Sequence, residues 1–340
     1  MIQHFKSHSL KKLNTFGMDV YADEFYEYST VDELEMLLNK KSLTNKRLLN
    51  LGSGSNFLFT SDFKGVILHS RIEGIEIAEE SNDEVIIAAG AGVIWDELVK
   101  WCVDKGFGGI ENLSLIPGTV GASVVQNIGA YGVELKDVFC KVEGIYIETG
   151  EKFIFYLDEC DFDYRFSIFK GTLKNKIVIT RLFLKLSKIP VFNIEYGILK
   201  SELDKQNESI SLQNIRNAII EIRNSKLPDP AVTGNAGSFF KNPIIDENSF
   251  FELKKNYPNV PFYEVSSGKL YKIPAGWLIE QSGWKGKNMG HAAIHPKQAL
   301  VIINLGNATG NEIIELATAI EKDIYDKFGI ILEKEVEVIK

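Results

Sequence analysis

A Gly/Ser-rich loop near the N-terminus joins two apolar segments that both have the pattern of a strand. The stretch LGSGSNFLF, residues 51–59, alternates Gly52 and Gly54 with Ser53, Ser55 and Asn56. Such a loop offers successive backbone N–H groups and hydroxyls, which suits a pyrophosphate, although an ordinary tight turn can have the same composition. Because FLF predicts a strand rather than the start of a helix, the loop is not the dinucleotide fingerprint of a Rossmann fold.

A second segment, residues 111–132, is equally rich in glycine and short polar side chains and reads ENLSLIPGTVGASVVQNIGAYG. Its glycines let the backbone approach a ligand closely, and its hydroxyls and amides offer hydrogen bonds at short intervals. A buried loop packed against strands would use the same glycines. We favour ligand contact, since so many polar residues would make a poor core.

Helical and strand patterns alternate along the rest of the chain without repeats, which predicts an α and β protein. Helices are expected at 30–40, at 95–109 with a stop at Gly106, at 215–226 and at 309–330. The last of these is predicted to end at Gly329 and to bury an apolar face formed by Ile313, Leu316, Ile320 and Ile324. Thr30 with Glu33 and Thr309 with Glu312 form capping boxes at the starts of the first and last of these. Several β-rich runs between 138 and 186 indicate largely antiparallel strands. The prolines of KLPDP end the third helix and favour a domain boundary near residue 226.

The composition is that of a soluble globular protein of two or three domains: 340 residues, 45% apolar and 25% charged. A net charge of -8 argues against a nucleic-acid or anionic-membrane binder, since those need a basic face. The N-terminus lacks a signal-peptide core and no apolar run approaches the ~20 residues of a membrane span, so we expect a cytoplasmic protein. The three cysteines have no metal-site spacing and are interpreted as reduced, mostly buried thiols.

Together the two glycine-rich loops resemble the flavin-binding half of vanillyl-alcohol-oxidase-type flavoproteins. The resemblance implies an α+β protein with an FAD-binding fold of the vanillyl-alcohol-oxidase/PCMH type, built of two α+β subdomains, plus a C-terminal α+β substrate-binding domain. We assign 1–70 to the first FAD-binding subdomain, 71–225 to the second and 226–335 to the substrate-binding domain. The final strand, 331–340, can return to the first subdomain.

A longer series of motifs resembles the UDP-N-acetylenolpyruvoylglucosamine reductase family over nearly the whole chain. In order, the motifs are NTFG, GSGSN, IPGTVGASVVQNIGAYG, YRFSIFK, KLPDP, GNAGSFFKNP, PAGWLIEQSGWKG and LEKEV. The length and the YRFSIFK and EYGIL segments resemble the type I form. The family reduces the enolpyruvyl ether of a UDP-sugar to a lactyl ether in peptidoglycan precursor synthesis, with hydride from NADPH passing through FAD. The expected partners are therefore these small molecules, and we expect a monomer.

Ser238, in GNAGSFFKNP, matches the proton donor of the family. No histidine lies within fifty residues of it, so the sequence offers no local base that would make it a nucleophile. A weak acid suffices for a proton donor, because protonating a carbanion is strongly downhill. Phe239 and Phe240 can exclude water. A serine that caps a helix is the alternative interpretation.

Two further residues match catalytic positions of the family. Arg165 lies among aromatic and apolar residues, and its guanidinium fork can pair with the substrate carboxylate and the enolate charge. Glu335 matches a glutamate that stabilises or protonates the enol-like intermediate. Its pattern alone, shared with Glu333 and Glu337, predicts a solvated strand edge, and the chain stops five residues later at Lys340, where longer relatives continue.

The binding residues follow from the two loops and from the resemblance. The predicted cofactor contacts are Gly52, Ser53, Gly54, Ser55, Asn56, Ser114, Pro117, Gly118, Thr119, Gly121, Ala122, Gln126, Asn127, Gly129 and Ala130. The predicted substrate contacts are Tyr196, Lys226, Asn242 and Gln298, and Lys241 offers further positive charge for the diphosphate.

Other candidate groups receive ordinary roles. We expect FAD to be non-covalent, since nothing around His69 supports an attachment point. His291 and His295 lack a nearby carboxylate in the sequence, so no metal site is predicted. Trp277 and Trp284 are predicted to lie in the core of the C-terminal domain.

Two other functions remain open at this level. One is an FAD oxidase of the same fold, although it would need a base rather than groups that protonate a carbanion. The other is a flavin- or nucleotide-binding sensor without activity.

Overall fold

The computed structural model describes all residues except 41–42, 44, 207–208 and 266–268. The chain forms two compact units. The first contains 1–9, 21–54 and 64–225, and the second contains 10–20, 55–63 and 226–340. Among the residues that the structure describes, none of the helices combines the length and the apolar character that crossing a bilayer requires.

The first unit begins with a four-stranded sheet in the order β1-β2-β5-β3. Its elements are β1 (Gln3–Ser9), β2 (Tyr21–Tyr28), β3 (Leu48–Asn50), β5 (Phe63–Ser70) and the helix α1 (Val31–Leu38). The α1 helix starts as predicted, because Thr30 Oγ1 accepts a hydrogen bond from Glu33 N at 3.1 Å. Leu34 and Leu37 bury its apolar face beside Tyr26 and Leu68.

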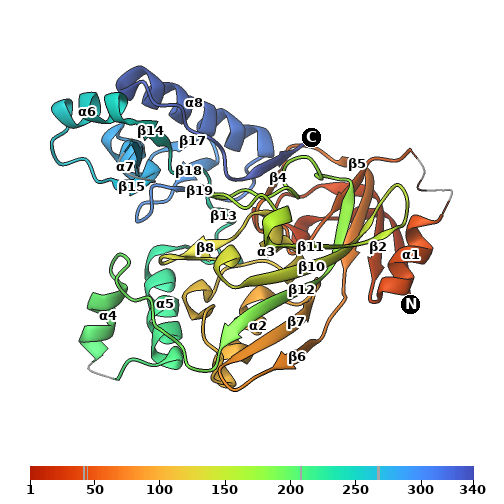
Figure 1. The fold of residues 1–340 in the computed structure, drawn as a ribbon. Coiled ribbons are helices and arrows are strands. Elements are labelled where there is room, and N and C mark those ends of the chain that lie inside the picture. Colours follow the sequence, from red (N-terminus) through yellow and green to blue (C-terminus); the bar gives the residue numbers. More distant parts are fainter. Residues whose placement is uncertain (41–42, 44, 207–208, 266–268) are drawn as a thin grey trace. The chain divides into compact units, whose positions relative to one another are not determined.

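A five-stranded antiparallel sheet forms the centre of this unit, in the order β11-β10-β12-β7-β6 (Figure 1). Its strands are β6 (Ile75–Glu80), β7 (Glu84–Gly90), β10 (Phe139–Tyr146), β11 (Lys152–Tyr156) and β12 (Ile177–Ser187). The antiparallel arrangement predicted for 138–186 is confirmed. The helices α2 (Trp95–Asp104) and α3 (Val120–Val125) share one apolar core with this sheet, in which Leu98, Cys102 and Val124 are fully buried.

Short elements complete the first unit. The two-residue strands β8 (Gly129–Ala130) and β9 (Val133–Glu134) form a hairpin, and the helices α4 (Leu199–Gln206) and α5 (Leu212–Lys226) have a small apolar cluster of their own. Four single-turn helices occur in the whole described chain, at Lys11–Leu13, Glu111–Leu113, Leu135–Asp137 and Leu157–Glu159.

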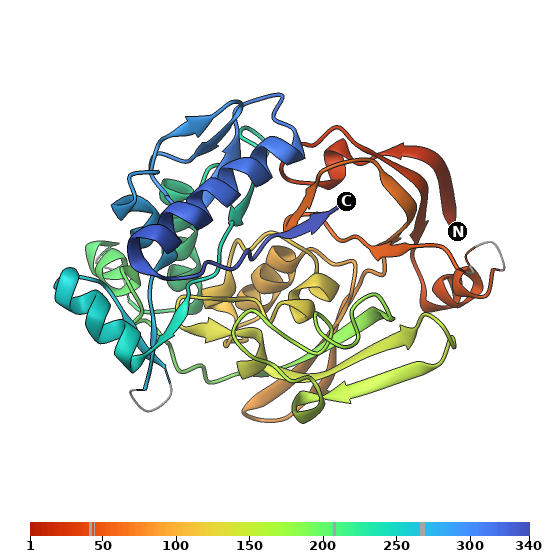
Figure 2. The same cartoon turned by 90° about the horizontal axis from the view of Figure 1, so that it is seen from above.

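The second unit has a four-stranded sheet in the order β13-β19-β18-β17, along which the helix α8 runs (Figure 2). These elements are β13 (Asn235–Ser238), β17 (Asn288–Met289), β18 (Ala292–Ile294), β19 (Val301–Asn304) and α8 (Gly310–Phe328). A three-stranded sheet of β14 (Ile244–Asp246), β16 (Leu270–Lys272) and β15 (Tyr263–Val265) accompanies α6 (Glu247–Asn256) and α7 (Ala275–Gln281). The strand β4 (Phe57–Phe59) pairs in parallel with the last strand, β20 (Glu337–Ile339).

The helix α8 agrees with its prediction at both ends and along its face. The Thr309 and Glu312 side chains each bond the other residue's backbone, which is the predicted capping box. The apolar face of Ile313, Leu316, Ile320 and Ile324 is fully buried. Gly329 ends the helix with a left-handed φ of 68°.

Two expectations for the second unit were wrong. The chain is not a strand over the whole of 331–339, because pairing with β4 begins only at Glu337. Trp277 and Trp284 are half-buried rather than core residues. Trp277 stands beside the Tyr257 and Phe328 rings, and Trp284 Nε1 donates to Asp323 at 3.0 Å, so each keeps one edge at the surface.

We expect Gly310→Ala to destabilise the second unit. A methyl group there would lie 2.1 Å from the backbone oxygen of Phe59, so α8 or β4 has to move. The expected loss in the free energy of unfolding is about 1–3 kcal/mol, measured by thermal or denaturant unfolding. Gly276→Ala in α7 is the matched control, because its methyl group would meet nothing closer than 3.5 Å. Equal stability of the two variants would contradict this prediction.

Candidate functional site

Within the first unit, the structure brings Gly52 of the first predicted cofactor loop against the second loop. A methyl group on Gly52 would lie 2.6 Å from Thr119 Oγ1 and 3.6 Å from the Ala122 side chain. Only glycine therefore allows the first loop to approach the second so closely. Two segments that are far apart in the sequence thus lie in contact at Gly52.

These loops fit a bound dinucleotide cofactor. Gly54 and Gly118 have φ values of 66° and 140°, conformations that residues with a side chain disfavour. Ser53 Oγ is buried and has no hydrogen-bond partner among the described residues, which is the state expected of a group that bonds a ligand. Pro117 and Ala122 leave the surface uncrowded because both are exposed and small.

Some of the predicted cofactor contacts use their side chains inside the protein. Ser114 is fully buried and donates to the backbone oxygen of Glu111 at 2.6 Å. Asn127, also fully buried, donates to Glu134 and to the backbone oxygen of Asp163 and accepts from the backbone of Lys136. The side chains of these two residues therefore stabilise the second loop from inside the protein.

Arg165 lies at the tip of a tight turn in the first unit. Asp163 and Phe166 close the turn with two backbone hydrogen bonds of 3.1 Å, and Arg165 has a left-handed φ of 54°. Its Nη2 donates to the backbone oxygen of Gly129 at 2.8 Å. A methyl group on Gly129 would come within 3.2 Å of Arg165 Nη1, so this glycine leaves room for the guanidinium. Asn127 joins the turn to the glycine-rich segment through Asp163, which orients Arg165 beside that segment.

His69 is a structural residue of the β5 strand. Its ring is nearly buried, and Nδ1 lies 2.7 Å from the backbone oxygen of Leu51, directly before the first loop. Burial lowers the pKa of His69 from its ordinary value, although the Leu51 bond opposes the shift. The buried, hydrogen-bonded ring supports the strand that precedes the loop.

In the second unit, Ser238 is the last residue of β13 and caps no helix. Gly237 before it has a φ of 68° and is held by the Asn235 side chain, which accepts from Gly237 N at 2.9 Å. Phe239 and Phe240 after it are fully buried and pack edge to face. The strand is therefore fixed on both sides of a half-buried serine.

Glu335 lies next to this strand. Glu335 N donates to the backbone oxygen of Phe239 at 2.8 Å, and Lys241 N donates to that of Glu333 at 2.9 Å. Asn56 bonds the same segment twice: its Nδ2 donates to Glu335 O at 3.1 Å, and its backbone oxygen accepts from Glu337 N at 2.9 Å. The C-terminal segment is thus anchored on both sides of Glu335.

The predicted substrate residues lie in several places. In the second unit, Asn242 accepts the backbone N–H of Ala275 at the start of α7, and Gln298 lies near the next residue of that helix, Gly276. Lys241 forms an ion pair with Glu333 at 3.0 Å, and Lys226 is exposed. In the first unit, Tyr196 is exposed and lies against Gly132.

Comparison with known proteins decides the family. The C-terminal domain of UDP-N-acetylenolpyruvoylglucosamine reductase matches residues 229–339, and an FAD binding domain matches 23–153. The chain is 48% identical to the UDP-N-acetylenolpyruvoylglucosamine reductase of Bacteroides fragilis, covering 98% of this chain and 99% of that protein. The chain belongs to the UDP-N-acetylenolpyruvoylglucosamine reductase family. The enzyme of that name from Flavobacterium johnsoniae is 46% identical, covering 97% and 98% of the two chains.

A solved structure supports the fold. The crystal structure of UDP-N-acetylenolpyruvylglucosamine reductase from Thermus caldophilus matches with a TM-score of 0.68 at 22% identity, covering 100% of this chain and 99% of that one. The predicted α+β class with an FAD-binding fold of the vanillyl-alcohol-oxidase/PCMH type is confirmed. As a member of the reductase family, the chain is an FAD-dependent oxidoreductase.

Residues that no sequence pattern had indicated hold the second loop of this reductase in place. Trp95 and Asp96, in the first turn of α2, bond the loop at Leu113, Leu115 and Gly118. Arg216 of α5 in turn bonds both carboxylate oxygens of Asp96. Burial acts to raise the pKa of Asp96, but the bonds from Arg216 and Leu115 N outweigh it and lower the pKa overall.

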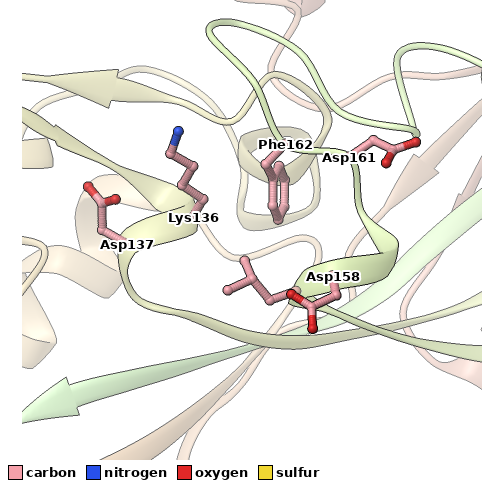
Figure 3. A pocket seen from close by; sticks show the side chains of 6 residues that line it. Lys136, Asp137, Asp158, Asp161 and Phe162 are labelled. Atoms are coloured by element: carbon pink, nitrogen blue, oxygen red, sulfur yellow. The ribbon is translucent and has the colours of Figure 1, made fainter. Parts of the chain in front are cut away.

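A depression lined by charged side chains and a His–Glu pair lie outside the predicted site. A depression of about 430 Å³ in the first unit has Phe162 in its wall and Lys136, Asp137, Asp158 and Asp161 around it (Figure 3). In the second unit His291 pairs with Glu312 at 3.1 Å, a carboxylate that is distant in the sequence. The described part of the chain contains no group of three potential metal ligands.

Proposed function

We propose that this chain reduces UDP-N-acetylglucosamine enolpyruvate to UDP-N-acetylmuramate with NADPH as hydride donor and non-covalently bound FAD. The reaction belongs to peptidoglycan precursor synthesis, and we propose that the chain works as a cytoplasmic monomer. The observation that carries the proposal is the bond from Glu335 N to the Phe239 backbone oxygen, at 2.8 Å. It joins the segment of the proposed acidic residue to that of the proposed proton donor, Ser238.

The chemistry supplied by bound FAD is hydride transfer from NADPH to the methylene carbon of the enolpyruvyl group. Negative charge then develops on the neighbouring carbon and spreads into the adjacent carboxylate as an enolate. The protein has to hold that carboxylate, stabilise the enolate and deliver one proton.

Ser238 delivers the proton from Oγ to the carbon next to the carboxylate. Its hydroxyl is a weak acid, but transfer to a carbanion is strongly downhill. Gly237 and Phe239 fix the backbone on both sides of the serine, and the buried rings of Phe239 and Phe240 can exclude water that would compete as a proton source.

Arg165 and Glu335 stabilise the negative charge that develops on the substrate. The guanidinium of Arg165, oriented by the Gly129 backbone oxygen, pairs with the substrate carboxylate as it becomes an enolate. Glu335 stabilises or protonates the enol-like form. Its backbone is held at N by Phe239 and at O by Asn56.

Binding is shared between the loops and the substrate residues. We propose that 1–70 and 71–225 provide FAD contacts, chiefly through the backbone of Gly52–Gly54 and Gly118–Ala122 and the hydroxyl of Ser53, and that 226–335 provides substrate contacts. Lys226 and Lys241 offer positive charge for the diphosphate, and Tyr196 offers a ring face for the uracil or sugar. Asn242 and Gln298 supply amide hydrogen bonds.

An anaerobic visible spectrum tests the proposal. The purified protein is reduced with NADPH and then mixed with UDP-N-acetylglucosamine enolpyruvate. We expect the flavin bands near ~450 nm to bleach with NADPH and to return when the substrate is added. Bands that return only in air would indicate an oxidase, and bands that never respond to NADPH or substrate would indicate a binding protein; either result would overturn the proposal.

A further inference from the structure

The second cofactor loop is held from one side by two consecutive residues of α2. Trp95 Nε1 donates to the Leu113 backbone oxygen at 2.9 Å, and Trp95 N donates to that of Gly118 at 3.0 Å. Between these points, Leu115 N donates to Asp96 Oδ1 at 2.5 Å. The first turn of α2 therefore bonds the start, middle and end of 113–118.

This loop needs such support because its own conformation is unfavourable. Leu115 has a φ of 58°, a left-handed value that a branched, non-glycine residue rarely adopts. A backbone of this kind persists only where surrounding contacts impose it. The bond from Leu115 N to Asp96 acts directly on the strained residue.

Asp96 is itself fixed by a buried arginine from another helix. Arg216 of α5 is 6% exposed, and its Nη1 and Nη2 donate to the two carboxylate oxygens of Asp96 at 2.6 and 2.8 Å. A bidentate pair sets the plane of the carboxylate as well as its position. Asp96 Oδ1 accepts from both Arg216 Nη1 and Leu115 N. By orienting the carboxylate, Arg216 therefore also positions the oxygen that bonds the loop.

We propose that Asp96 and Arg216 are positioning residues for cofactor binding: the ion pair holds the 113–118 loop in its binding conformation. The inference rests on the proposed role of this loop in FAD binding. If the ion pair only joined α2 to α5, it would need no bond to the loop. The bond to Leu115 links the pair to the strained backbone, and that bond gives it a consequence for the cofactor.

Four variants at the two positions test the inference in the full-length protein. Arg216→Lys keeps the charge but loses the fork, and Arg216→Met removes both. Asp96→Asn keeps an acceptor for Leu115 N, whereas Asp96→Ala removes it. The dissociation constant of FAD is measured by titrating the apoprotein, together with the melting temperature of the apoprotein and the absorption spectrum of the bound flavin.

We expect Arg216→Lys and Asp96→Ala to raise the FAD dissociation constant about tenfold, Arg216→Met to raise it at least as much, and Asp96→Asn to raise it less than Asp96→Ala. Arg181→Lys, at an ion pair with Glu76, is the control and should leave the constant unchanged. Lower melting temperatures with an unchanged FAD constant in the folded protein would show a structural role alone and overturn the inference. Arg216→Lys and Asp96→Asn keep the test valid if the two other variants fail to fold.

Gly52→Val separates this inference from the proposed function. Its side chain would crowd Thr119, so FAD binding should weaken if the two loops hold the cofactor. Weaker binding in Gly52→Val with normal binding in all four ion-pair variants would overturn only the positioning role. Normal binding in every variant would overturn the cofactor role of the loops as well.

Discussion

Ser238→Ala should separate the two half-reactions. Reduction of bound FAD by NADPH should stay nearly normal, while reoxidation by the enolpyruvyl substrate should slow by about 10²- to 10⁴-fold, the usual contribution of a positioned acid. Alanine keeps the strand between Gly237 and Phe239 intact and removes only the hydroxyl that supplies the proton. Anaerobic stopped-flow absorbance measures both steps in the same sample.

Ser238→Cys is the matched control for this result. A thiol is of similar size and is a stronger acid than a hydroxyl, so it can still deliver a proton. We expect its reoxidation rate to lie between those of the wild type and the alanine variant. An equal loss of both half-reactions in Ser238→Ala would show damage to flavin binding instead and would remove Ser238 from the proton-donor role.

The sequence predicted those parts of the fold whose causes are local. The α8 helix carries its capping box, its apolar face and its terminal glycine within one continuous stretch, and the structure reproduces all three. The first glycine-rich loop was recognised in the same way, because the strand pattern on each side of it is short and contiguous.

Long-range contacts explain what the sequence left open. The pattern around Glu335 predicted a solvated strand edge, but the residue is anchored by Asn56, which is 279 positions away. Arg216 and Asp96 are 120 positions apart, so no local pattern could reveal their pairing. Because a pattern of polar residues does not say which way each side chain points, it also could not show that Ser114 and Asn127 form their hydrogen bonds inside the protein.

Arg165→Lys should also impair reoxidation while leaving reduction by NADPH intact. Arg165 uses Nη2 to bond the Gly129 backbone oxygen and lies near the Tyr164 ring, contacts that orient a planar fork. A lysine ammonium is a point charge and cannot keep the Gly129 bond while pairing two oxygens of a carboxylate. Loss of such oriented charge stabilisation predicts a decrease of about 10²-fold in the rate of reoxidation.

Arg181→Lys serves as the control for Arg165 as well. Arg181 also lies near an aromatic ring, that of Phe183, and pairs with Glu76 on the five-stranded sheet, but the proposed chemistry does not use it. We expect that variant to turn over normally. The Arg165→Lys variant keeps Ser238 and therefore keeps the proposed proton donor. Added substrate should therefore still reoxidise the flavin completely, only slowly, and normal turnover of Arg165→Lys would place Arg165 outside the site.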